Sequence, residues 1–262
     1  MSERVRASAV AGMFYPADSE ELGRAVRGFL SKVDVDSVGS PKALIVPHAG
    51  YIYSGAIAAS AYACVQPEQI TRVVLIGPSH RVLFHGLAAP ESILWKTPLG
   101  DVMVDFEVLK KISTFPQVTF SEKAHREEHC LEVQLPFLQE MLGEFRIIPL
   151  VVGDSSPEEV AEVLEALWGG PETLIVISSD LSHYESYEQA DKKDQIAARA
   201  IEDLDLRGLD HDHACGFIPI AGLVHLARQK GMRAELLDLR NSGDTAGPKD
   251  QVVGYGAFAL YE

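Results

Sequence analysis

The stretch that decides the fold is ALIVPHAGYIYSG, residues 43–55. Its first four residues are all apolar and lack the alternation of a half-exposed strand, which predicts a strand buried on both faces. Pro47 cannot donate a sheet hydrogen bond and predicts the end of that strand. Ser54 predicts the cap of a helix over Gly55–Val65. His48 therefore follows the carboxyl end of a buried strand, where open α/β sheets bind their ligands.

The same arrangement recurs twice. Residues 73–80 read VVLIGPSH and residues 174–184 read LIVISSDLSHY, so each apolar run is again followed by a turn that carries a histidine. Parallel strands end at the same edge of a sheet, and side chains that follow neighbouring strands therefore converge. The side chains expected to converge here are His48, His80, Asp180 and His183.

The rest of the chain alternates between helical and strand patterns. Amphipathic spacing predicts a helix that begins at Asp18, and a serine followed by proline predicts the start of a helix that runs through Trp168. Leucines at helical spacing predict a helix within residues 124–142, and Trp95–Gly100 is predicted to be a turn. Nothing divides residues 1–262, which predicts a single α/β domain with a mostly parallel central sheet flanked by helices.

Composition excludes several classes of protein. The formal net charge of −15 argues against nucleic acid and anionic membrane surfaces as partners, because both require a basic face. No apolar run is long enough for a transmembrane helix. The three cysteines lack CxxC spacing, which argues against a disulfide framework or a structural zinc site and favours a reducing cytoplasm.

A second group of functional candidates is Glu128, His129 and Glu132, at the front of the leucine-rich segment. The start of a helix favours anionic ligands and makes a histidine there easier to deprotonate. The alternative is a capped helix whose carboxylates are solvated.

The residues at the predicted sheet edge have the chemistry of a metal site. Two imidazoles and a carboxylate with open positions are the ligand set of non-haem iron(II) oxygenases, and the same set suits catalytic zinc. Asp180 and His183 share a face only if their turn is helical. The chain has no phosphate-binding glycine loop and no Gly-x-Ser-x-Gly elbow. Cys130 and Cys215 are either nucleophiles or buried, inert thiols.

Six motifs in the same order resemble those of the Memo family, whose prokaryotic members are often labelled AmmeMemoRadiSam system protein B. They are Gly12-x-Phe14-Tyr15-Pro16, the segment from Val46 to Gly55, Gly77-Pro78-Ser79-His80, Glu128-His129-x-x-Glu132-x-x-Leu135-Pro136, Ser178-Ser179-Asp180-x-x-His183-Tyr184 and Cys215-Gly216. This family is similar in fold to the class III extradiol dioxygenases, which open catechol rings with a non-haem iron. The resemblance implies that His48 and His80 are metal ligands, with Asp180 and His183 beside them in the pocket.

One position departs from the family pattern. Animal Memo proteins place a cysteine ligand immediately before an Arg-Asn pair, whereas Leu239 stands before Arg240-Asn241 here. Leucine cannot bind a metal. The third ligand is therefore Asp180, His183, Asp244 or absent.

The first functional hypothesis is a metal-dependent oxidoreductase with iron(II), copper or zinc as the expected metal. His183 or His129 would shuttle a proton, and Asp180 would hold its partner imidazole. An unidentified small-molecule substrate would contact Tyr51, Tyr53, Glu128, Cys215 and Asp244.

The second hypothesis is a non-catalytic binding protein that retains the pocket. Animal Memo is described as an adaptor that recognises phosphotyrosine peptides, and the three-part name of the prokaryotic family implies a radical-SAM partner protein. A metal-dependent hydrolase is the third hypothesis. The first two hypotheses would use the same ligands, so the sequence leaves the choice between them open.

Overall fold

One sheet forms the centre of the molecule. The computed structural model describes residues 4–34 and 39–262, and within these residues twelve strands join the sheet in the order β1-β5-β6-β8-β3-β9-β2-β12-β10, with β11 paired to β12 and β4 paired to β7 and β8. The strands are β1 (Val5–Arg6), β2 (Ala43–Val46), β3 (Arg72–Pro78), β4 (Leu87–Ala89), β5 (Leu94–Thr97), β6 (Gly100–Val104), β7 (Val118–Phe120), β8 (Arg146–Val152), β9 (Thr173–Ser178), β10 (His183–Glu185), β11 (Arg233–Asn241) and β12 (Val252–Tyr261).

Four parallel strands, β8, β3, β9 and β2, form the middle of the sheet. All residues of β2 and β9 are buried, and so are all but the first residue of β3, which explains their unbroken apolar sequences. The next neighbour, β12, is antiparallel to β2. The carboxyl ends of β2, β9 and β3 therefore lie side by side, as the sequence predicted, and the segments that follow them meet at one edge.

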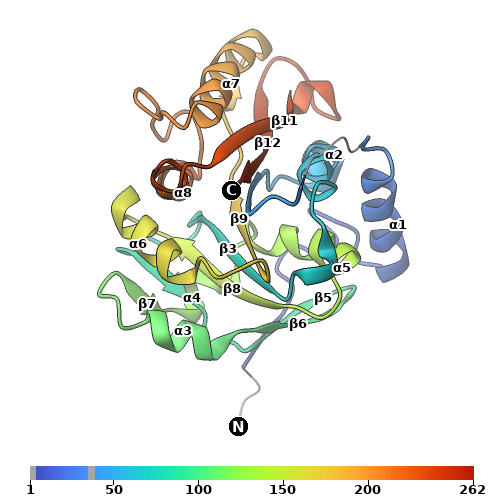
Figure 1. Ribbon diagram of the computed structural model, residues 1–262. Coiled ribbons are helices and arrows are strands. Elements are labelled where there is room, and N and C mark those ends of the chain that lie inside the picture. Colours follow the sequence, from blue (N-terminus) through green and yellow to red (C-terminus); the bar gives the residue numbers. More distant parts are fainter. Residues whose placement is uncertain (1–3, 35–38) are drawn as a thin grey trace.

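Helices cover both faces of this sheet. In Figure 1, α1, α2 and α5 lie together on one side, and α6 and α8 lie on the other. The helices are α1 (Ser19–Leu30), α2 (Tyr51–Tyr62), α3 (Phe106–Ile112), α4 (Glu122–Arg126), α5 (Leu135–Met141), α6 (Pro157–Leu167), α7 (Tyr187–Glu202) and α8 (Phe217–Lys230), with short 3-10 turns η1 (Pro67–Gln69), η2 (Glu132–Gln134) and η3 (Ser242–Asp244). Within the described ranges, none of them combines the length and apolar character that crossing a membrane requires.

Local capping explains where two of these helices begin. The carboxylate of Asp18 accepts a hydrogen bond from the backbone N–H of Glu21 at the start of α1. At the start of α6, Ser156 Oγ accepts from Glu159 N, and the Glu159 carboxylate accepts from Ser156 N, which is a complete capping box. Both starts agree with the sequence prediction.

Two predicted helices differ in the structure. Helix α2 begins at Tyr51, before the predicted Gly55, and Ser54 Oγ donates to Ala49 O instead of capping. The segment 124–142 is not one helix but α4, η2 and α5. Pro136 lies in the first turn of α5, where its fixed φ and missing N–H favour a helix start over continuation of an earlier helix.

The predicted turn at Trp95–Gly100 is wrong. Trp95 lies buried in β5, which pairs with β6 as an antiparallel hairpin. The turn is confined to the residues between these two strands.

Candidate metal centre and pocket

His48 stands immediately after β2, beside the end of β9. Its backbone N–H donates to Asp180 Oδ1 at 2.7 Å, and its ring Nδ1 lies 3.0 Å from Ser178 Oγ. The Ser178 hydroxyl donates to Cys130 O and accepts from Gln134 Nε2. Because a hydroxyl has only one hydrogen, His48 Nδ1 must be the donor to Ser178, and the lone pair of His48 is on Nε2.

His80 has the same orientation for a different reason. Its Nδ1 lies 2.9 Å from Glu128 Oε1, and its backbone N–H donates to Glu128 Oε2. An ionised carboxylate only accepts, so Nδ1 carries the hydrogen and Nε2 carries the lone pair. A carboxylate that holds a histidine in this way is a common feature of metal sites.

Glu128 is itself an unusual group. Burial alone would raise the pKa of its carboxyl, but the imidazoles of His129 and His80 outweigh burial and hold the pKa well below its usual range. Among the described residues, its ion pairs are with these two histidines, and no lysine or arginine pairs with its carboxylate. A buried anion therefore lies directly behind His80.

Cys215 reaches the same place from the start of α8. Its Sγ lies 3.3 Å from His48 Nε2. Gly216 makes this approach possible, because a Cβ at that position would lie 2.6 Å from the Cβ of Ser179. Burial, followed by the charge of Asp180, raises the pKa of the Cys215 thiol to about 12.

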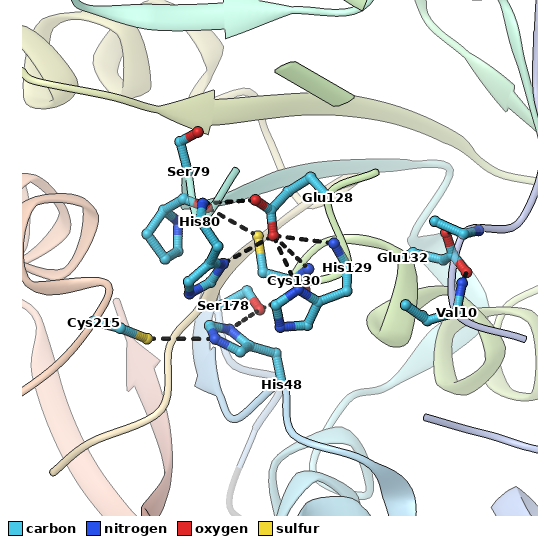
Figure 2. Close-up of polar contacts among 12 residues, drawn as sticks. Val10, His48, Ser79, His80, Glu128, His129, Cys130, Glu132, Ser178 and Cys215 are labelled. Atoms are coloured by element: carbon cyan, nitrogen blue, oxygen red, sulfur yellow. Dashed lines mark hydrogen bonds and ion pairs between the residues drawn. The ribbon is translucent and has the colours of Figure 1, made fainter. Parts of the chain in front are cut away.

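These three side chains offer a compact set of donor atoms. One ligand atom each of His48, His80 and Cys215 lies within 4.8 Å of the other two, and Figure 2 shows them side by side. Burial lowers the pKa of His48 to about 4, so its imidazole is neutral at physiological pH, which is the form that binds metals. The Nε2 lone pair of each histidine and the sulfur of Cys215 suit a transition metal. These residues therefore fit the metal that the family resemblance implies.

A second possible donor set shares His80. Glu128 and His129 also offer ligand atoms within 4.8 Å of it. However, Glu128 Oε1 already accepts from His80 Nδ1 and from the backbone N–H groups of His129 and Cys130. The first set is therefore better suited to hold a metal, because its Nε2 atoms have no such competing bonds to a carboxylate.

A pocket of about 530 Å³ adjoins the histidines. Its lining comes from the N-terminal arm, the segments after β2, β3 and β9, the segment between α4 and η2, and the segment from η3 into β12. The lining residues are Phe14, His48, Ala49, Gly50, Tyr53, His80, His129, Asp180, His183, Tyr184, Ser242, Gly247, Pro248, Gln251, Val253 and Tyr255. A cavity of this size can hold a small molecule.

The sequence of the whole domain matches one protein family. The family model for Memo-like proteins matches residues 6–259. The chain belongs to the Memo family. It is similar to MEMO1 family proteins of Aquifex aeolicus, at 41% identity over 96% of this chain and 97% of the relative, and of Ignicoccus hospitalis, at 39% over 97% of both. A MEMO1 family protein of Sulfolobus acidocaldarius is 36% identical over 96% of this chain and 97% of the relative.

Most site residues predicted for this Memo chain lie at the pocket, but the predicted third metal ligands are not the ones that the structure places beside the two histidines. Asp180 and His183 both line it, although the turn between them is not helical. Asp180 Oδ2 lies 3.9 Å from His48 Nε2. His183 is exposed, and its Nδ1 donates to Leu181 O. Neither is in the compact donor set, where Cys215 is the third member.

Four residues predicted to bind substrate do not line the pocket: Tyr51, Glu128, Cys215 and Asp244. Glu128 lies behind His80, and Cys215 lies beside His48. Tyr51 is buried, and its hydroxyl donates to Val133 O at 2.7 Å. Asp244 accepts from the Tyr187 hydroxyl and from Asn241 N. Both stabilise the segments that carry other pocket residues, whereas Tyr53 lines the pocket directly.

The N-terminal arm contributes a wall that the functional interpretation of the sequence did not include. The Phe14 ring lies 4.8 Å from that of His129. The arm is held by a buried ion pair between Arg6 and Glu132 at 2.6 Å, and Arg6 also donates to the backbone carbonyl of Glu128. Tyr15 donates to Glu132. The sequence signals for this role were the aromatic residues of the arm and its Gly12-x-Phe14-Tyr15-Pro16 motif.

Proposed function

We propose that this Memo protein binds a transition metal ion through Nε2 of His48, Nε2 of His80 and Sγ of Cys215, and that it acts as an oxidoreductase on a small molecule in the adjoining pocket. The observation that carries the proposal is that one ligand atom each of His48, His80 and Cys215 lies within 4.8 Å of the other two. The tautomers fixed by Ser178 and Glu128 make Nε2 the free nitrogen of each histidine. Metal–ligand bonds of about 2.0–2.3 Å allow one ion to contact all three.

The sulfur donor bears on the identity of the metal. Iron(II) is the expectation from two histidines and a carboxylate, whereas two imidazoles and a thiolate also suit copper and zinc. When bound, iron or copper would supply a one-electron redox couple, and zinc would supply a Lewis acid. We therefore place iron and copper ahead of zinc. The cysteine pattern of the sequence continues to favour a cytoplasmic location.

The chain's own residues have distinct roles in this proposal. Ser178 and Glu128 fix the tautomers of the two histidines, and Asp180 holds the backbone of His48. His129 lines the pocket with its ring centroid 4.8 Å from that of His80, a position from which it can move a proton to or from a bound substrate. His183, farther out, is the alternative proton carrier.

Metal content tests the proposal. Protein purified anaerobically and loaded with iron(II), copper(I) or zinc is measured by mass spectrometry. We expect about one equivalent in the wild type, loss in His48→Ala, and weaker binding in Cys215→Ser but not in the matched control Cys64→Ser. If the wild type and His48→Ala are equally empty after loading, the proposal fails. Oxygen consumption with candidate substrates then tests the redox step.

A non-catalytic binding role is the second candidate. It is supported by exposed apolar side chains next to pocket-lining residues: Met13 precedes Phe14, and Ile52 precedes Tyr53. A peptide or a radical-SAM protein could cover them. Metal-loaded protein that binds such a partner but consumes no oxygen with any substrate would favour this role.

A further inference from the structure

We infer that the pocket selects aromatic ligands that are uncharged or cationic, and that it rejects those with a carboxylate or phosphate group. The inference rests on the proposed function only in taking this pocket as the ligand site. The metal-binding residues alone do not determine which kind of molecule the pocket binds, and this inference assigns that chemical class.

The first observation is the lining itself. Among the sixteen lining residues there is no lysine and no arginine. The nearest basic residues along the chain are Arg81, next to His80, and Lys249, next to Pro248, and neither lines the pocket. The ammonium of Lys249 instead lies 4.4 Å from the ring centroid of Tyr187. An anionic ligand would therefore find no side-chain partner of fixed positive charge in the lining.

Two of the N–H groups at the start of α2 are not available to an anionic ligand. Gly50 lines the pocket at the beginning of this helix, and helix starts favour anions through their free N–H groups. Here the N–H of Tyr51 donates to Phe14 O, and the N–H of Tyr53 donates to Gly50 O. These two donors are already used within the protein.

The second observation is the sign of the charges at the pocket floor. Asp180 lines the pocket, and the Glu128 carboxylate lies behind His80. Among the described residues, no lysine or arginine pairs with the Glu128 carboxylate, and none lines the pocket. In a partly desolvated site, these two carboxylates repel a further anion and attract a cation.

The third observation is the aromatic wall. Phe14, Tyr53, Tyr184 and Tyr255 all line the pocket. Their rings provide apolar faces for a planar ligand and negative quadrupoles for an ammonium group. Tyr184 is 73% exposed and lies at the rim of the pocket. Its backbone has a left-handed φ of 58°, a conformation that few residues other than glycine adopt.

The test uses three probes with the same phenol ring and different charge: tyramine, tyrosol and 4-hydroxyphenylacetate. Binding to the full-length protein, metal-free and metal-loaded, is measured by calorimetry and by ligand-observed NMR. We expect tyramine and tyrosol to bind at least about tenfold more tightly than the acid in both forms, with the tyramine preference decreasing at high salt.

Three variants sharpen this test. Asp180→Asn should reduce the ratio of tyramine to acid affinity several-fold, while Asp191→Asn, an exposed aspartate on α7 outside the pocket lining, should leave it unchanged. Tyr184→Leu should weaken tyramine binding, and its exposure makes a folding defect a poor explanation.

Each outcome decides the inference. Equal or tighter binding of the acid to either form overturns it, as does failure of all three probes to bind. If the protein takes up no metal but the metal-free form keeps the order of affinities, the proposed metal function fails and this inference stands.

Discussion

Glu128 and Glu132 lie one helical turn apart in sequence, and both are fully buried, yet their surroundings differ. Glu132 accepts from the Arg6 guanidinium, from the Tyr15 hydroxyl and from two backbone N–H groups of the N-terminal arm. Glu128 accepts from the His80 imidazole and from three backbone N–H groups, with no lysine or arginine paired to it in the described part of the chain.

This difference separates a carboxylate that holds the N-terminal arm from one that adjoins the candidate metal site. Glu132 is paired with the positive charge of Arg6. Glu128 has hydrogen-bond partners but no arginine or lysine, and one of its partners, His80, presents its other nitrogen to the candidate metal position. Figure 2 shows Glu128 next to His80 and Glu132 next to Val10 of the N-terminal arm.

The largest predicted effect is on Glu132. Glu132→Gln leaves Arg6 buried without its partner, and we expect a loss of about 3–5 kcal/mol in the free energy of unfolding. Urea denaturation at neutral pH measures it. The control is Glu140→Gln, whose partner Arg27 is largely exposed and which should cost less than about 1 kcal/mol. Equal losses in the two variants would contradict the structural role of Glu132.

A third buried carboxylate, Asp194 on α7, extends the comparison because it has no ion pair among the described residues. Its Oδ1 accepts from Ser182 N, and burial raises its pKa from 3.8 to about 6. The native state therefore binds more protons than the unfolded state between these values, so stability falls as pH rises from about 4 to 6, by up to about 3 kcal/mol.

Asp194→Asn keeps an oxygen acceptor for Ser182 and has no charge to bury. We expect this variant to be more stable than the wild type at pH 7 and to lose the decline between about pH 4 and 6. Thermal denaturation across this range measures the effect, with Glu188→Gln on the same helix as control. An unchanged pH profile in Asp194→Asn would contradict the assignment.

The smallest predicted effect on folding is that of Glu128. Glu128→Gln removes the charge behind His80, and we expect metal affinity to fall by about 10–100-fold. The metal-free variant should lose less stability than Glu132→Gln, because no arginine is left unpaired. Competition with a chelator measures the affinity. If Glu128→Gln instead lowers the free energy of unfolding and leaves the metal affinity unchanged, Glu128 has a structural role like that of Glu132.

Much of the fold was predictable because it depends on local patterns. The apolar runs ending at Val46, Ile76 and Ile177 correspond to β2, β3 and β9, and their parallel order brings His48 and His80 together. The hairpin at Trp95 was missed because burial of its strand is decided by contacts with β1, which is remote in sequence.

The candidate site was predictable only in part for the same reason. Nothing in the spacing of residues indicates that Cys215 lies beside His48, since that contact depends on how α8 docks against the end of β9. Gly216 was the available signal, because its missing side chain permits the approach to Ser179. The Arg6–Glu132 pair likewise joins opposite ends of a long segment, and sequence reasoning had no means of pairing them.

The three donor atoms come from residues 48, 80 and 215, and the sulfur is thus supplied by the last fifth of the chain. During translation, the two histidines leave the ribosome well before Cys215 is made. The set of three donors therefore forms only late in synthesis, after Cys215 has been made and α8 has docked. In the proposed function, a metal held by all three donors would be taken up at that stage or later, after the two histidines have waited without their sulfur partner.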